Sequence, residues 1–105
     1  MTKPMNQDVN AVYNGILRPV EGAQQKVAFT DISAQSAVFK TDIVTLFATQ
    51  NCWVRFGSNP TAAANDGNSV YLAAFFYHAF SCVPGEKLAV IRDSANGDLH
   101  IAGGA

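Results

Sequence analysis

The side chains that most often perform acid–base catalysis are few in this sequence and stand apart from one another. His78 lies within an aromatic stretch, and His100 lies between two apolar residues near the end of the chain. A catalytic base needs a nucleophile to activate and a further group to orient it. Neither histidine has such partners close by in the sequence. We therefore expect both to pack against neighbours or face solvent, and we expect the protein not to be an enzyme.

Three aspartates fall in segments rich in turn-forming residues: Asp66, Asp93 and Asp98. In such segments an Asp side chain commonly accepts hydrogen bonds from nearby backbone amides. The run from Asp93 to Asp98 is slightly similar to a calcium-binding loop, but it lacks an acidic residue at the third position and the distal Glu. The sequence therefore indicates neither a metal site nor a cofactor.

Cys52 and Cys82 are the two cysteines of the chain. They are too few and too widely spaced for a zinc site, and neither belongs to a Cys-x-x-Cys motif. Free cysteine behaves as a small hydrophobic residue, which favours two buried thiols. The alternative is a disulfide, either between Cys52 and Cys82 or from one of them to a neighbouring chain, since particles released from a cell meet oxidising conditions.

The densest group of large side chains contains Tyr71, Phe75, Phe76, Tyr77 and Phe80. Successive residues of a strand point to opposite faces, so Phe75, Phe76 and Tyr77 cannot all enter one core. Aromatic residues are enriched in the cores of protein interfaces. We therefore predict that all of this group except Phe80 contact another subunit. The alternative is a local bend or bulge that turns the rings inward.

The elements that would position these residues are short strands, because apolar and polar residues alternate from Gln25 onward. Strands are expected at 26–30, 37–40, 43–49, 52–56, 87–93 and 98–102, with a longer stretch at 69–83 divided by a bend near Ala73-Ala74. Asn96-Gly97 predicts a hairpin between the last two strands. About seven to eight short antiparallel strands without an amphipathic helix predict an all-β fold, a small β-sandwich or barrel.

The alternation also predicts the residues of the core. They are Val27, Phe29, Val44, Leu46, Val54, Phe56, Leu88, Val90 and Leu99.

Residues 1–24 have a different character from the rest of the chain. They are polar and are interrupted by two prolines and two glycines, so we expect an extended N-terminal arm followed by a domain at 25–105. Asn14-Gly15 predicts a small hairpin within the arm. Its apolar residues Tyr13, Ile16 and Leu17 are expected to dock on a neighbouring subunit. The alternative is a disordered terminus.

Composition narrows the classes of partner. Of the 105 residues, 49% are hydrophobic and 14% are charged, whereas soluble domains carry roughly a quarter charged residues. The surplus of apolar residues suggests contact with other subunits. The net charge of −1 with scattered Lys and Arg residues argues against nucleic acid as a partner. The longest uncharged apolar run is far shorter than the roughly 20 residues of a membrane span, and the N-terminus does not read as a signal peptide.

Several segments together resemble a class of small proteins encoded among the virion genes of tailed bacteriophages. The matching segments are 44–57, 59–62, 77–92 and 97–101, with Asn51-Cys52 opening a strand, Gly-x-x-Pro-Thr-Ala at 57–62 and Pro-Gly-Glu-Lys at 84–87. The resemblance covers roughly Ile43 to Ile101. It implies a compact β-sandwich that serves in capsid decoration or cement, or as an accessory piece of the tail or head-tail region.

The expected function is therefore adhesion between subunits of a virion that assembles in the cytoplasm of the bacterial host. The partners would be other copies of this chain and other virion proteins, such as major capsid or tail proteins. The alternative is a β module that binds a glycan or a host surface molecule, with Trp53 and Tyr71 as platforms on which sugar rings stack.

Overall fold

The computed structural model describes residues 18–104. They form eight strands, and no helix occurs in this range. The strands are β1 (Pro19–Phe29), β2 (Ala34–Gln35), β3 (Ile43–Ala48), β4 (Cys52–Gly57), β5 (Val70–Leu72), β6 (Tyr77–Ser81), β7 (Lys87–Arg92) and β8 (Gly97–Gly104). The prediction of an all-β fold is confirmed.

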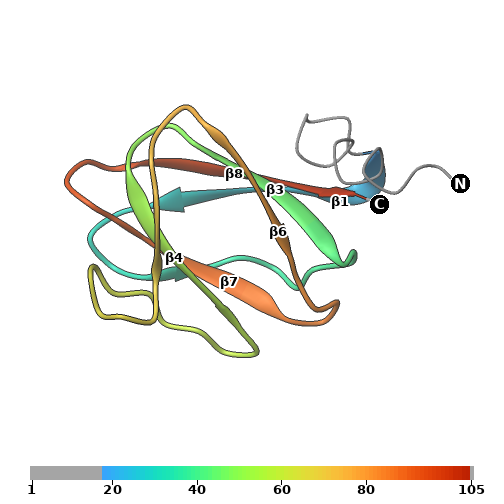
Figure 1. Ribbon diagram of the computed structural model, residues 1–105, viewed down its shortest axis with the longest axis horizontal. Helices are drawn as coiled ribbons and strands as arrows, with labels where there is room; N and C mark the ends of the chain where they lie inside the picture. Colours follow the sequence, from blue (N-terminus) through green and yellow to red (C-terminus); the bar gives the residue numbers. More distant parts are fainter. Residues whose placement is uncertain (1–17, 105) are drawn as a thin grey trace, which may run out of the picture.

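The strands make two antiparallel four-stranded sheets that pack face to face (Figure 1). One sheet has the order β1-β8-β3-β6, and the other has the order β2-β7-β4-β5. The fold is thus a sandwich and not a barrel. This arrangement, in which nearly every connection crosses from one sheet to the other, is that of an eight-stranded jelly roll.

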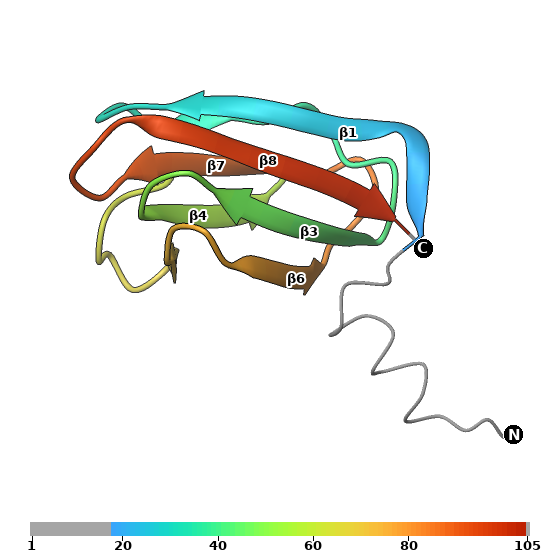
Figure 2. The same ribbon diagram turned by 90° about the horizontal axis from the view of Figure 1, so that it is seen from above.

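The first sheet begins earlier in the chain than expected. β1 starts at Pro19, so residues 19–24, which are expected to belong to the N-terminal arm, are part of a strand that pairs with β8 of the same chain: Pro19 lies opposite Gly104 and Gln24 opposite Ala102. Figure 2 shows β1 and β8 running side by side along the sandwich. The Gly22 break that suggested an arm is a local irregularity of this strand, where Gly22 adopts φ +82°. Residues 1–17 of the expected arm lie outside the described residues.

The hairpin predicted at Asn96-Gly97 does not form. β7 and β8 belong to different sheets, so the turn between them crosses the sandwich. Gly97 is instead a site of close approach: a Cβ atom there would lie 2.8 Å from Thr49 Oγ1 and 2.9 Å from Phe29 Cζ. Glycine is therefore needed at position 97 because neighbouring strands leave no room for a side chain, and not because a two-residue turn requires its backbone conformation.

The strand expected at 37–40 is also absent, and β2 lies a few residues earlier. Beyond β2 the chain still follows β7, but its hydrogen bonds are irregular. The Ser36 amide donates to Leu88 O, while the Leu88 amide donates to Ser36 Oγ instead of a backbone carbonyl. Because a side chain replaces a main-chain acceptor, the regular ladder ends there.

The core lies between the two sheets and matches the prediction. Of the nine predicted residues, Phe29, Val44, Leu46, Val54, Leu88, Val90 and Leu99 are buried, and Val27 and Phe56 are partly buried against them. In β3 the residues alternate between buried and half-buried. One face of this strand therefore enters the core, and the other lies on the outer surface of the sandwich.

Candidate functional site

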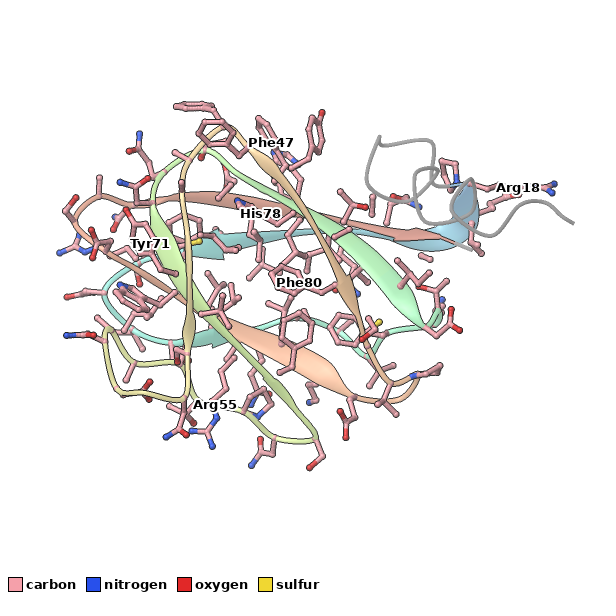
Figure 3. The ribbon with its side chains drawn as sticks, in the orientation of Figure 1. Arg18, Phe47, Arg55, Tyr71, His78 and Phe80 are labelled. Carbon is pink, nitrogen blue, oxygen red and sulfur yellow. The ribbon has the colours of Figure 1, made fainter. Side chains whose placement is uncertain are left out.

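Aromatic side chains gather on the outer face of the first sheet. Phe47 of β3 lies opposite Tyr77 of β6 on one side and His100 of β8 on the other. Its ring centroid is 4.8 Å from that of Tyr77, 6.2 Å from that of Phe75 and 6.5 Å from that of His100. With the adjoining Phe76, these residues form what we call the aromatic patch. Phe47 is labelled in Figure 3, where it stands among several rings at the rim of the sandwich.

The patch is exposed to solvent. Phe75, Phe76 and Tyr77 have exposed fractions of 66%, 63% and 76%. The predicted bend between the two halves of this stretch exists, at 73–76, but it turns the rings outward. The alternative in which a bend buries all three rings is therefore wrong.

Phe75 occupies an unusual backbone conformation. Its φ of +65° lies in the left-handed region, which is a genuine outlier for a bulky residue. Two hydrogen bonds hold the turn: the Phe75 amide donates to Ala48 O at 2.9 Å, and the Ala74 amide donates to Asn51 Oδ1 at 2.8 Å. The end of β3 and the β3–β4 turn therefore support a strained residue whose ring points into solvent.

The structure separates aromatic residues that lie close together in the sequence. Tyr71 lies on β5, in the second sheet, and is not part of the patch. Conversely, Phe47 belongs to the patch although it is not among the predicted interface residues. The signal for Phe47 was available, because the alternation of β3 places it on the face opposite Val44 and Leu46. The predicted interface residues Tyr13, Ile16 and Leu17 lie outside the described residues.

A second, smaller aromatic pair lies on the outer face of the other sheet. Trp53 of β4 stands opposite Tyr71 of β5, with ring centroids 5.1 Å apart in an edge-to-face arrangement. Trp53 Nε1 donates a hydrogen bond to Asp93 Oδ1 at 3.1 Å. Tyr71 is exposed and Trp53 is half-buried. This pair combines ring faces with a carboxylate, as a weak sugar site would.

The two cysteines are free thiols, and an intrachain disulfide is excluded by their positions. Cys52 lies beyond the last residue of β3. Cys82 lies in space beside the opposite end of β3, because the Cys82 amide donates a hydrogen bond to Asp42 O. The six residues of β3 span about 20 Å, but a disulfide requires Cα atoms within about 7 Å. Burial raises the pKa of Cys52 to about 12. Burial, and then the charge of Asp42, also raise the pKa of Cys82.

The polar candidates for catalysis do not come together. His78 points toward the interior and stacks on Phe80 with centroids 6.5 Å apart, and its Nε2 atom is buried without a hydrogen-bond partner (Figure 3). His100 is exposed at the edge of the aromatic patch. Asp66 accepts bonds from the amides of Asn68 and Ser69, and the former is the main cause of its lowered pKa.

Among residues 18–104, no three His, Cys, Asp or Glu side chains are grouped as metal ligands would be. One surface depression of about 320 Å³ is lined by residues 55–61 at the end of β4, and Arg55 is the charged residue of that lining. No helix of the described range has the length and apolar character needed to cross a membrane.

Comparisons with known proteins add no relative. The chain matches no protein-family model, no curated protein and no solved structure. The class of fold is therefore defined by the geometry of the chain itself. It is a small jelly-roll β-sandwich with an exposed aromatic patch on one sheet.

Proposed function

We propose that this chain is a non-catalytic structural protein of a tailed-phage virion, which packs against copies of itself and against other virion proteins. Capsid decoration or cement is the favoured role, followed by an accessory role in the tail or head-tail region. The observation that carries the proposal is the aromatic patch, in which three consecutive rings are mostly exposed on the isolated subunit.

The patch favours a protein partner for energetic reasons. Full burial of one large apolar side chain contributes roughly 1.5–3 kcal/mol, and none of the patch residues carries a fixed charge that burial would have to desolvate. The left-handed conformation of Phe75 adds local backbone strain beneath an exposed ring. Strain of this kind is concentrated at functional sites.

The fold is compatible with the proposal. Jelly rolls occur in viral capsid domains and also in lectins, so the architecture admits both functions that the sequence suggested. Because a fold does not by itself define a function, the choice between them depends on the surface. The aromatic patch is larger and more apolar than the Trp53–Tyr71 pair, and it favours assembly.

The test is the binding of purified subunits to phage particles made without this protein. Phe76→Ser should abolish co-sedimentation with the particles while leaving the thermal melting temperature within a few degrees of the wild type, because Phe76 is mostly exposed. Ile32→Ser is the matched control, since Ile32 is an exposed apolar residue outside the patch. If Phe76→Ser binds particles as the wild type does, the patch is not the contact surface. If the wild type binds no particle, the proposed function is wrong.

A second candidate function is glycan binding at the Trp53–Tyr71 pair. It is favoured by the contact between Trp53 Nε1 and Asp93, which places an acceptor for sugar hydroxyls beside two rings. Titration with oligosaccharides should then change the fluorescence of Trp53, the single tryptophan, and Tyr71→Ala should remove the change. The absence of any response across a glycan panel would contradict this candidate.

A further inference from the structure

β6 is an edge strand with one side open. Within the described residues, β6 pairs with β3 and stands at the end of the sheet order β1-β8-β3-β6. The Cys82 amide donates to Asp42 O, and the register continues through Phe80 opposite Val44 and His78 opposite Leu46. In an antiparallel ladder, only every second residue of a strand exchanges main-chain hydrogen bonds with a given neighbouring strand, and the main-chain groups of the residues between point the other way. The amides and carbonyls of Tyr77, Ala79 and Ser81 therefore point away from β3, toward the open side.

Among residues 18–104, the other edges of the sandwich are protected against further strand pairing, whereas the edge formed by β6 is not. β1 carries Glu21 and Lys26 and has an irregular register; β2 and β5 have only two and three residues. Charges, bulges and shortness are the usual means of blocking unwanted strand pairing. β6 has five residues with no Lys, Arg, Asp, Glu or Pro and an unbroken register.

Exposed apolar side chains flank this open strand at both ends. Of the eight large apolar residues that are exposed in residues 18–104, four lie in β6 or within two residues of it. Phe75, Phe76 and Tyr77 are at its beginning, and Val83, with an exposed fraction of 56%, is just beyond its end.

We propose that the occupant of this edge is β6 of a second copy, paired antiparallel about a two-fold axis through Ala79, so that two first sheets join into one continuous eight-stranded sheet. In this register Ala79 faces Ala79 of the second copy, and Tyr77 faces Ser81. Tyr77, Ala79 and Ser81 of each strand, whose amides and carbonyls point away from β3, then all pair with the second copy. This gives six new main-chain hydrogen bonds. Registers shifted by two residues would leave some of these groups unpaired.

The side chains suit the same register. The small Ala79 sits on the axis, where two larger side chains would collide, and the bulky Tyr77 meets the small Ser81. Just outside the paired strands, Phe75 of one copy lies opposite Val83 of the other, which brings together the exposed apolar residues of the two ends. A surface that is complementary to itself in this way is what a two-fold contact requires. This inference deepens the proposed function by naming the self-contact.

The first test is the mass of the full chain in solution with and without a block at Ala79. The wild type should sediment at twice the chain mass of 11.2 kDa at high concentration. Ala79→Lys, which places like charges opposite each other, should raise the dimer dissociation constant by roughly tenfold or more. Ala28→Lys is the matched control, because Ala28 is exposed on β1, the opposite edge of the same sheet. This control should dimerise like the wild type.

Ala79→Pro is a second variant. Proline lacks the amide N–H that in Ala79 points away from β3, and proline is tolerated at such edge positions. It should therefore fold and remain a monomer. A wild type that stays monomeric to millimolar concentration, or Ala79 variants that dimerise normally, would overturn the proposal.

Amide hydrogen exchange separates edge pairing from other modes of dimerisation. The amides of Tyr77, Ala79 and Ser81 should exchange more slowly at high than at low protein concentration, whereas those of His78 and Phe80, bonded to β3, should be protected at both. Dimerisation without this protection would contradict the strand pairing. Particle binding that survives Ala79→Lys would leave the proposed virion function intact and remove only its dependence on this dimer. A wild type that dimerises through β6 but binds no particle would support the strand pairing and contradict the proposed virion function.

Discussion

At the scale of single residues, Phe75 combines backbone strain with exposure of a large ring. A left-handed conformation costs a non-glycine residue roughly 1–2 kcal/mol, and its edge-to-face contact with Phe47 returns about 0.5–1.5 kcal/mol. The two contributions nearly cancel in the isolated subunit. The ring of Phe75 is therefore expected to matter for assembly more than for folding.

Phe75→Asn should change the free energy of unfolding by no more than about 1 kcal/mol, because Asn tolerates the left-handed region. Phe29→Ala, by contrast, should cost about 3–5 kcal/mol, since Phe29 is fully buried and its loss leaves a cavity. Urea denaturation of both variants measures the difference. Equal destabilisation by the two substitutions would show that Phe75 contributes to the core.

The thiols give a second prediction at this scale. Cys52 should be inert to a thiol reagent at pH 8 in the folded protein and should react on unfolding, because the reactive thiolate is disfavoured by burial. Its folded pKa of about 12 exceeds the ordinary value of 9.0. The stability associated with the neutral thiol is thus fully present below pH 9 and is lost as the pH rises from 9 to 12. Cys52→Val should flatten that alkaline decline; an unchanged decline would assign it to other groups.

At the scale of elements, the connection from β7 to β8 depends on Gly97. Gly97→Ala should destabilise the protein by about 1–3 kcal/mol, the usual range for overpacking, because its Cβ would contact Thr49 and Phe29 below 3.0 Å. Gly57→Ala is the control: the nearest atom to its Cβ is Pro60 Cβ at 3.8 Å. Denaturation midpoints compare the two. If both variants are equally stable, the close approach at Gly97 is relieved by small shifts of its neighbours.

At the scale of the whole molecule, the jelly roll has a definite beginning at β1. Deletion of residues 1–17 should leave the melting temperature nearly unchanged, because β1 and its pairing with β8 remain. Deletion of 1–24 should lower it, since it removes the pairing at Gln24 and the buried Ala23. Thermal melting of both chains measures this. If the two deletions melt alike, residues 19–24 contribute little to the domain.

Truncation also tests the role proposed for the N-terminal segment. If Tyr13, Ile16 and Leu17 dock on a neighbour, the chain lacking residues 1–17 should fold normally but bind particles more weakly. Undiminished binding would restrict the contact surface to the described domain.

Much of this architecture was predictable from local sequence patterns. A period of two determines which side chains share a face. This was sufficient to predict seven residues of the buried core and two, Val27 and Phe56, that pack against it, together with the bend before β6 and most strand positions. The same rule predicted that Phe75, Phe76 and Tyr77 could not all enter one core, whereas the exposure of all three results from the turn before β6, where Phe75 adopts a left-handed conformation.

Only the tertiary structure decided which strands pair and which aromatic residues meet. Strand pairing depends on contacts between residues far apart in the chain, such as Phe47 with Tyr77 and His100, and local alternation carries no information about them. Asn96-Gly97 is a local pattern that predicts a hairpin, but β7 and β8 lie in different sheets. Gly97 packs instead against Phe29 and Thr49, which are far from it in the chain. The sequence by itself determined the faces of the strands, and long-range packing determined their neighbours.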